Sequence, residues 1–140
     1  MILIQSWEDA QNQAYPIRQA VFIQEQGVPE VMEIDELDPI AAHALAFLNT
    51  QCVGTARLVT LNRTRCQIGR MAVLASYRKQ GVGGQLLGAL IEHGREQGMA
   101  EYLLHAQLIA VPFYEKWGFV AQGEVYDEAG IPHRNMILLI

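Results

Sequence analysis

The segment of this chain best suited to chemistry is a glycine-rich turn that opens a helix-like stretch. It reads Arg78-Lys79-Gln80-Gly81-Val82-Gly83-Gly84. The first turn of a helix has N–H groups without intrahelical partners and a partial positive charge, so it is a ready phosphate site. Glycine in a helix is unfavourable by about 1 kcal/mol relative to alanine. This helix holds four, at positions 83, 84, 88 and 94. The pattern favours a phosphate-bearing ligand over the structural alternative, a flexible turn with close helix packing.

Two familiar phosphate loops do not fit the turn. A nucleoside-triphosphate loop ends in Gly-Lys-Ser/Thr, which this turn lacks. The dinucleotide fingerprint needs a third glycine where Leu86 stands, and it normally follows an early parallel strand. The turn therefore indicates a phosphate site of another kind.

The elements around the turn predict a mixed, mostly antiparallel sheet of six or seven strands with about four flanking helices. Strand-like runs cover residues 2–5, 43–49, 52–61, 66–74, 102–108, 118–125 and 133–140, and residues 127–132 connect the last two. Pro16 predicts a kinked helix or two short helices after the first strand. Gly69 beside Arg70 indicates a bulge or a close backbone approach. The order is β-α-β-β-β-α-β-α-β-β, an α/β (α+β mixed) architecture.

Composition indicates one globular domain over residues 1–140. The chain is 51% hydrophobic and 18% charged.

Cys52 and Cys66 lie in separate apolar runs and are expected to be buried free thiols. No run reaches the length of a membrane span, the N-terminus lacks the pattern of a signal peptide, and no His, Cys or carboxylate spacing predicts a metal. We therefore expect a cytoplasmic protein that binds no membrane and no metal.

The net charge of −5 comes from one segment. Five of the fifteen acids lie within nine residues, and the other ten equal the ten basic residues in number. These five acids are Glu30, Glu33, Asp35, Glu36 and Asp38. An acidic chain disfavours nucleic-acid partners. The segment itself is either a solvated loop or part of a binding site, and both interpretations stand.

Two motifs in register resemble the GNAT superfamily of N-acetyltransferases. Arg78, Gly81 and Gly83 match its Arg-x-x-Gly-x-Gly motif for the acetyl-CoA pyrophosphate. Residues 110–119, AVPFYEKWGF, are similar to its Ala-x-x-x-Tyr-x-x-x-Gly-Phe segment. Residues 17–29, the acids, and the sequence GIPH at 130–133 further resemble the small bacterial ElaA-type branch of predicted acyltransferases. The resemblance implies a GNAT-like three-layer fold with acetyl-CoA as co-substrate.

The resemblance also implies the cofactor residues. The strand Arg70-Met71-Ala72-Val73 would hydrogen-bond the pantetheine arm, and an N–H near Met71 to Val73 would polarise the thioester carbonyl. Tyr114 occupies the position of the acid that protonates the CoA thiolate; its structural alternative is an aromatic core residue beside Phe113. The implied cofactor-binding set is Met71, Ala72, Val73, Arg78, Lys79, Gln80, Gly81, Val82, Gly83, Gly84, Gln107 and Tyr114.

The acceptor side is implied less specifically. Glu33, Asp35, Glu36, His105 and His133 fall where the family places the walls of its acceptor site. We expect substrate contacts from Glu33, Asp35, His105 and His133, and a general base in His133 or Glu33. Histidine titrates nearest to neutral pH, which favours His133. The alternatives are a polar strand start for His133, a buried hydrogen-bonded histidine for His105, and a solvated loop for the acids.

The function implied is acetyl transfer from acetyl-CoA to a small-molecule primary amine by direct attack in a ternary complex. Neither motif holds a nucleophilic Cys or Ser, so an acetyl-enzyme is not supported. One alternative is a CoA-binding regulatory or partner module without transferase activity. Another is acyl-homoserine lactone synthesis, which shares an Arg-x-x-Val-Phe start but needs a longer chain. A monomer or a homodimer fits either transferase.

Overall fold

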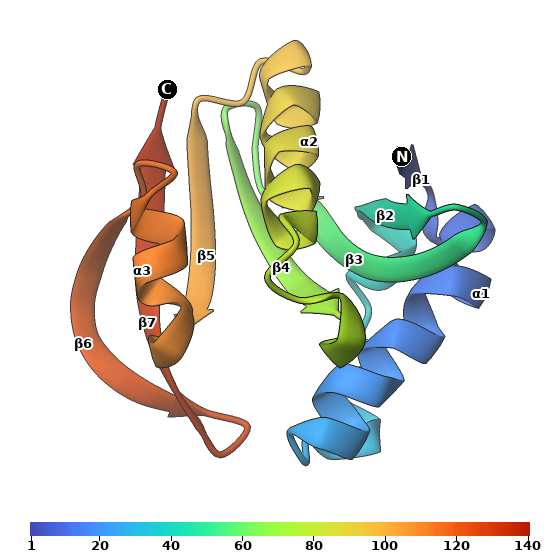
Figure 1. Cartoon of the computed structure of the whole chain (residues 1–140). Coiled ribbons are helices and arrows are strands. Elements are labelled where there is room, and N and C mark those ends of the chain that lie inside the picture. The colour runs from blue at the N-terminus through green and yellow to red at the C-terminus, as the bar shows by residue number, and fades with distance from the viewer.

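A seven-stranded sheet, in the order β1-β2-β3-β4-β5-β7-β6, carries the fold. The computed structural model describes all residues, 1–140 (Figure 1). The strands are β1 Ile2–Gln5, β2 Ala42–Leu48, β3 Gln51–Thr60, β4 Arg65–Val73, β5 Glu101–Gln107, β6 Val120–Glu128 and β7 Ile131–Leu139. The α-helices are α1 Trp7–Arg18, α2 Val82–Glu96 and α3 Val111–Glu115. Every strand pair is antiparallel except β4 with β5. The element order and the mixed sheet confirm the sequence-based expectation.

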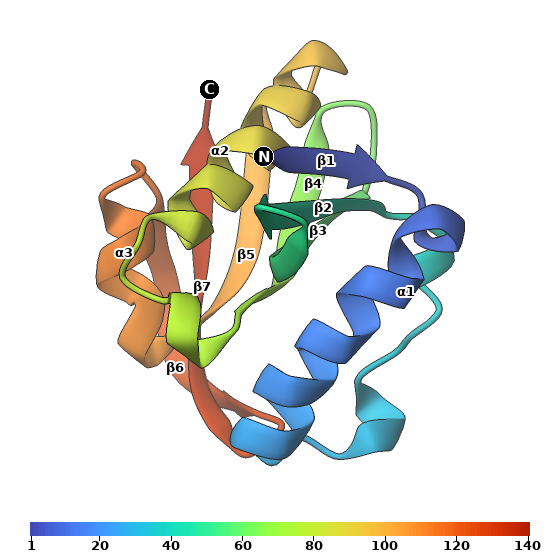
Figure 2. The ribbon, with the colours of Figure 1, turned by 45° about the vertical axis from the view of Figure 1, so that its right-hand side comes forward.

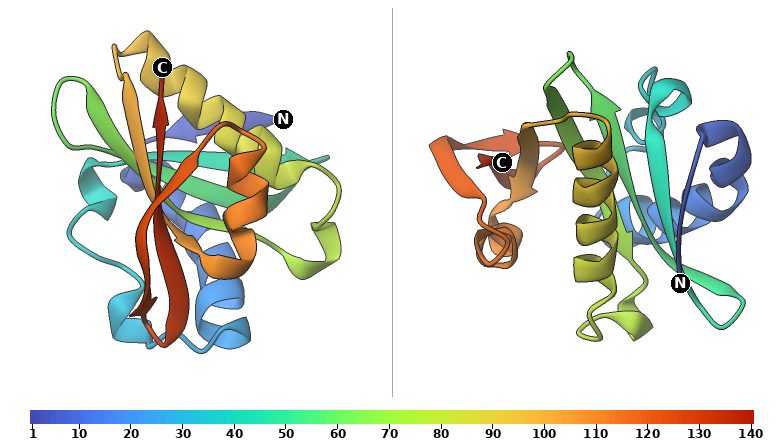
Figure 3. Two further views of the ribbon diagram at one scale, coloured as in Figure 1. Left: turned by 90° about the vertical axis from the view of Figure 1, so that its left-hand side faces the viewer. Right: turned by 90° about the horizontal axis from the view of Figure 1, so that it is seen from above.

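Helices α1 and α2 cover opposite faces of the sheet (Figure 3). Successive side chains of a strand point to opposite faces. On β2, Ala44 and Ala46 accordingly belong to the core beneath α2, whereas Leu45 between them belongs to the core beneath α1. Two hydrophobic cores therefore hold the sheet between helical layers.

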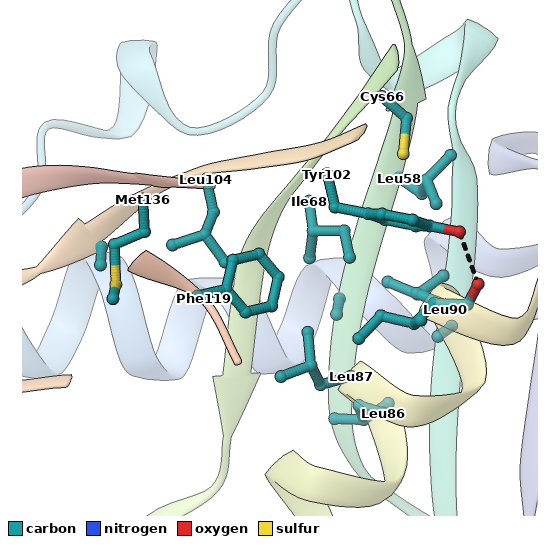
Figure 4. Close-up of a cluster of buried hydrophobic side chains, with 14 of the residues drawn as sticks. Leu58, Cys66, Ile68, Leu86, Leu87, Leu90, Tyr102, Leu104, Phe119 and Met136 are labelled. Atoms are coloured by element: carbon teal, nitrogen blue, oxygen red, sulfur yellow. Dashed lines mark hydrogen bonds between the residues drawn. The ribbon is translucent and has the colours of Figure 1, made fainter. Parts of the chain in front are cut away.

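The core under α2 is built by the apolar face of that helix. Leu86, Leu87 and Leu90 are fully buried and face Tyr102 of β5 (Figure 4). The Tyr102 hydroxyl donates a hydrogen bond to the carbonyl of Ile91 at 2.7 Å, which satisfies its one polar group within the core. This contact fixes α2 against the strand that forms one wall of the site.

Helix α1 does not break at Pro16 but changes its winding afterwards. The α-helix ends at Arg18, and residues Gln19–Glu25 continue as a π-helix (Figure 2). Proline has no N–H to donate to the preceding turn, which loosens the helix there. One continuous element therefore stands where a kinked helix or two short helices were expected, and three α-helices flank the sheet instead of about four.

Strands β4 and β5 pair only at their beginnings and then diverge (Figure 1). Their parallel pairing covers Arg65–Gln67 with Glu101–Leu103 and no further residues. Past this point β4 has a bulge, since its register against β3 shifts between Gly69 and Ala72, and Arg70 has φ of 49°. The expected bulge beside Gly69 is confirmed. The divergence opens the middle of the sheet.

The last hairpin differs from the expectation. Strand β6 continues through Glu128, and the turn is only Ala129-Gly130, with φ values of 54° and 79°. Two consecutive positive φ values are typical of the tight turn that joins twisted strands. The expected connection over 127–132 was wrong. Strand β6 lies at the edge of the sheet, where one face is exposed to solvent and polar side chains are tolerated, so the polar residues there belong to a strand.

Replacing Gly94 by alanine tests the packing of α2. A Cβ at Gly94 would lie 2.7 Å from the Tyr102 hydroxyl, which its own hydrogen bond holds in place. We expect Gly94→Ala to lower the free energy of unfolding in urea by about 1–3 kcal/mol. The control is Gly84→Ala, whose Cβ would lie an ordinary 3.6 Å from Trp117, and which should change stability by less than about 1 kcal/mol. Equal stability of the two variants would contradict this packing.

Candidate active site

A cavity of about 1150 Å³ lies where β4 and β5 diverge. Its walls come from both strands, the N-terminus of α2, helix α3, the segment before β2 and the β6–β7 hairpin. The residues predicted from the sequence that line it are Glu33, Asp35, Met71, Ala72, Val73, Arg78, Lys79, Gly81, Val82, Gly83, Gly84, His105, Gln107, Tyr114 and His133. Two of the predicted residues, Gln80 and Glu36, lie outside the cavity wall and are exposed; the Gln80 amide donates to the Ser76 carbonyl at 3.4 Å.

The edge of β4 that faces the cavity offers backbone hydrogen-bonding groups. Beyond Gln67 this strand bonds β3 on one side, while β5 has moved away on the other. Backbone N–H and C=O groups are obligatory hydrogen-bonding groups, so a free strand edge attracts an extended ligand. Met71, Ala72 and Val73 lie on this edge and line the cavity.

The N-terminus of α2 adds an anion-attracting end. Gly81 precedes the helix with φ of 83°, Lys79 has φ of 64°, and no side chain caps the first turn, which holds no acid. The first N–H groups of the helix are therefore free.

The four glycines of this helix are of two kinds. A Cβ at Gly88 or Gly94 would crowd Trp117 or Tyr102, whereas one at Gly83 or Gly84 would lie an ordinary 3.6 Å from Phe113 or Trp117. Packing does not demand glycine at 83.

Two side-chain contacts tie the π-helical segment to the cavity wall. Arg78 donates two hydrogen bonds to Glu25, at 2.7 and 2.6 Å, and its Nε donates to the Val73 carbonyl at 2.9 Å. The Gln107 amide donates to Gln26 Oε1 at 2.8 Å. Gln26 was missed in the sequence because its partner is distant in the chain and no spacing links the two.

Tyr114 points its hydroxyl toward β4. The oxygen lies 3.7 Å from the sulfur of Met71, and the ring packs edge-on against Phe113 and Phe119. Burial raises the pKa of Tyr114 to about 12, so the phenol keeps its proton at neutral pH. The residue is thus both an aromatic core contact and a protonated hydroxyl on the cavity wall.

Three of the five clustered acids belong to an arginine–carboxylate network made of Arg18, Glu33, Asp35, Asp38, Arg57 and Arg70. Arg18, which is fully buried, binds Glu33 through Nε and holds Asp38 in a two-point contact at 2.8 and 3.0 Å. Arg57 donates two hydrogen bonds to Asp35, at 2.7 and 3.0 Å, and one to Asp38 at 2.9 Å. Three guanidinium groups balance three carboxylates, so the network is neutral.

This network corrects the solvated-loop interpretation. The side chains of Glu33 and Asp38 are 2% and 0% exposed, and of the five clustered acids only Glu30 and Glu36 are exposed. Arg70 closes the network on the cavity side by donating to the Glu33 carbonyl and to Asp35, both at 3.1 Å. Glu33 and Asp35 therefore line the cavity with their charges already neutralised.

A second cluster of titratable groups lies on the opposite wall. His105 Nδ1 of β5 lies 3.1 Å from Glu128 Oε1, and His133 Nε2 of β7 lies 3.6 Å from Glu128 Oε2. His105 is 42% exposed, so the buried-histidine alternative for it is wrong. Glu128 was missed because it was assigned to a turn, and the register of β6 with β7 is what brings it here.

Other features carry less chemistry. Cys52 and Cys66 are buried and free, as expected, and burial raises the pKa of Cys66 to about 12. No group of three or more His, Cys, Asp or Glu side chains is arranged to hold a metal ion. None of the helices has the length and apolar character needed to cross a membrane.

Asp38 tests the network through stability. Burial opposes its ionisation, but the hydrogen bonds and charge of Arg18 outweigh burial and lower its pKa from 3.8 to about 2. A depressed pKa stabilises the fold above about pH 4, and this stability, about 2 kcal/mol, is lost as the pH falls toward 2. We expect Asp38→Asn to lower the free energy of unfolding at pH 7 by about 3 kcal/mol and to flatten its fall between pH 4 and pH 2.

The matched control for this prediction is Glu36→Gln, an exposed acid of the same segment with no ion-pair partner. Urea unfolding of this variant should follow the natural protein at both pH values. A control as unstable as Asp38→Asn would show that the segment, not the network, responds to the loss of a charge.

Comparisons with known proteins agree with this geometry. The acetyltransferase (GNAT) domain family matches residues 7–140. YjcF, an uncharacterized N-acetyltransferase of Bacillus subtilis, is 36% identical over 131 residues, which cover 93% of each protein. ElaA of Escherichia coli is 33% identical over 86% of this chain and 81% of its own length.

Solved structures show the same relationship. The crystal structure of Escherichia coli ElaA superposes with a TM-score of 0.85 at 30% identity, covering 98% of this chain and 99% of ElaA. An acyl-CoA N-acyltransferase from Pseudomonas aeruginosa gives 0.85 at 30% identity, covering 98% and 97%. The expected class of acyltransferase is thereby confirmed. The chain belongs to the GNAT family of acetyltransferases.

Proposed function

We propose that this protein transfers an acetyl group from acetyl-CoA to a small-molecule primary amine by direct attack in a ternary complex. The observation that carries the proposal is the single cavity that joins the free edge of β4, the uncapped N-terminus of α2 and the Tyr114 hydroxyl. The Pseudomonas aeruginosa relative, named an acyl-CoA N-acyltransferase, supports an acyl-CoA donor. A cytoplasmic monomer or homodimer remains the expected setting.

The phosphate end of the donor would bind at the start of α2. Free N–H groups of Val82, Gly83 and Gly84 can donate to a pyrophosphate, and Lys79, in the turn before α2, and Lys116, directly after α3, also line the cavity. Gly81 and Gln80 contribute the turn that leads into the helix. Arg78 already binds Glu25 and Val73, so we assign it to holding this turn in place.

The thioester end would follow the edge of β4. Met71, Ala72 and Val73 present backbone groups to an extended arm, and a backbone N–H among them can polarise the carbonyl as an oxyanion donor. Gln107 lies across the cavity on β5 with an amide that can bond the same arm.

Proton transfer completes the chemistry. The attacking amine must lose a proton, and the departing thiolate must gain one. Tyr114 keeps its proton at neutral pH and can give it to the thiolate. His133 is the better candidate for the base, since Glu33 is enclosed by Arg18 and Arg70.

Gly83→Asp tests the phosphate site. A carboxylate in the first turn of α2 would occupy the approach to the free N–H groups and repel a pyrophosphate. We expect the Kd for acetyl-CoA to rise by at least about 100-fold in titration calorimetry. Gln85→Asp is the control, because it adds the same charge to the same helix at an exposed position outside the cavity wall. Unaltered acetyl-CoA binding by Gly83→Asp would place the phosphates elsewhere.

Tyr114→Phe tests the proton donor. Loss of the hydroxyl should lower kcat by about 100-fold, the usual size of one general-acid contribution, while the Kd for acetyl-CoA stays within about twofold. Tyr77→Phe is the control: Tyr77 also lines the cavity, but its hydroxyl bonds Gln51 at 3.0 Å. If kcat is unchanged in Tyr114→Phe, the thiolate takes its proton from another group.

Thiol release over a panel of amines separates this proposal from its alternative. A regulatory module that only binds CoA would bind acetyl-CoA normally and release no thiol with any amine. Measurable turnover would exclude that alternative.

A further inference from the structure

Glu128 is the one acid on the cavity wall whose charge is not neutralised by an arginine or a lysine. Three acids line the cavity. Glu33 and Asp35 belong to the neutral arginine–carboxylate network, whereas the contacts of the Glu128 carboxylate are His105 and His133. The negative charge available to a ligand therefore lies on the β6–β7 hairpin and not in the acid-rich segment.

Three strands hold this histidine–carboxylate cluster, which we define as His105, Glu128 and His133. Glu128 is the last residue of β6 and lies opposite Ile131 of β7. The ring of Tyr126 stacks on His133 with 6.1 Å between centroids and meets His105 edge-on at 6.1 Å. Groups carried by strands and packed against an aromatic ring keep a defined geometry.

The His133 ring presents an unpartnered nitrogen toward the carboxylate. Its Nδ1 lies 2.7 Å from the Ile131 carbonyl. A carbonyl only accepts hydrogen bonds, so Nδ1 carries the proton and Nε2 of the neutral ring carries a lone pair. Nε2 faces Glu128 Oε2 at 3.6 Å, and the His133 side chain is only 8% exposed. In the neutral ring, Nε2 and the Glu128 carboxylate are both acceptors, so a ligand N–H group placed between them can donate to either.

We propose that the histidine–carboxylate cluster binds the ammonium group of the acceptor, so that the acceptor class is a positively charged primary alkylamine. This inference rests on the proposed acetyl transfer. An alkylammonium has three N–H donors and one positive charge, which suits a carboxylate oxygen and an imidazole lone pair at once. Arginines neutralise the other two acids of the cavity wall, so Glu128 is the group that favours a positively charged acceptor over a neutral one.

The cluster also accounts for the first proton transfer. The ammonium passes one proton to His133 Nε2, and the resulting imidazolium is stabilised by Glu128. The neutral amine then attacks the thioester carbonyl carbon, the C–S bond breaks, and Tyr114 gives its proton to the thiolate. The amide nitrogen loses its second proton to the cluster. Of the two protons that the ammonium loses, the first leaves His133 to solvent before the second is taken up, and the second restores the Tyr114 hydroxyl that protonated the thiolate.

A matched pair of amines tests the charge selection. The isomers 4-methylbenzylamine and 4-ethylaniline have the same atoms, but at pH 7.5 the first is an ammonium and the second is neutral. These two amines are part of a panel of alkylamines and arylamines. The rate of thiol release is measured for each amine at saturating acetyl-CoA. We expect the natural protein to prefer the alkylamines, and Glu128→Gln to raise KM for alkylamines about tenfold, the size of one charge-assisted hydrogen bond. KM for the neutral arylamines and the Kd for acetyl-CoA should stay within about twofold, because neither depends on the Glu128 charge.

The control is Glu124→Gln, an exposed acid of the same strand outside the cavity wall, which should match the natural protein. Glu128→Lys, a charge reversal at a partly exposed position, should raise KM for alkylamines further than Glu128→Gln does. Equal changes for both amine classes, or an unchanged alkylamine preference in Glu128→Gln, would overturn the inference and leave the transferase intact. Acetyl-CoA binding without thiol release from any amine would overturn the proposed function itself.

Discussion

The divergence of β4 from β5 is the constraint on which the site depends. Parallel pairing stops after Gln67, so the sheet opens and its backbone groups on one side meet the cavity instead of a neighbouring strand. The bulge at Arg70 lies on the same strand and turns that residue toward the acid-rich segment. Helices α2 and α3 then bring an uncapped helix end and the Tyr114 hydroxyl to the opening. None of these groups would form a site in a fully paired sheet.

The arginine–carboxylate network places ionised groups along this opening while keeping their summed charge at zero. Burying a charge is costly unless it is paired and hydrogen-bonded, and here each carboxylate contacts at least one guanidinium group. The network joins α1, β3 and β4 to the segment before β2, so it fixes that segment as one wall of the cavity. The cavity wall thus holds two lysines, Lys79 and Lys116, and one carboxylate, Glu128, that is not paired with an arginine.

The two motifs, the order of helices and strands along the chain and the bulge beside Gly69 were predicted from the sequence, because each is a local pattern of glycine, proline and apolar spacing. The helix around Pro16 and the end of β6 were not. Local signals at Pro16 and at residues 127–132 favour a break and a turn, but packing of α1 and pairing with β7 overrode them. The sequence also did not decide the charge partners, since the ion pairs of Arg18 and Arg57 join residues fifteen to twenty-two positions apart.

Family and fold class follow from the linear chain, since a glycine turn before an amphipathic helix has the same physical meaning in any context. The assignment of acidic charge does not. Composition places the excess at residues 30–38, yet folding neutralises three of those acids with arginines from α1, β3 and β4. Glu128, unremarkable in the sequence, becomes the uncompensated carboxylate because strand register sets it between two histidines. Coulombic partners are chosen by distance in space, and only folding defines that distance.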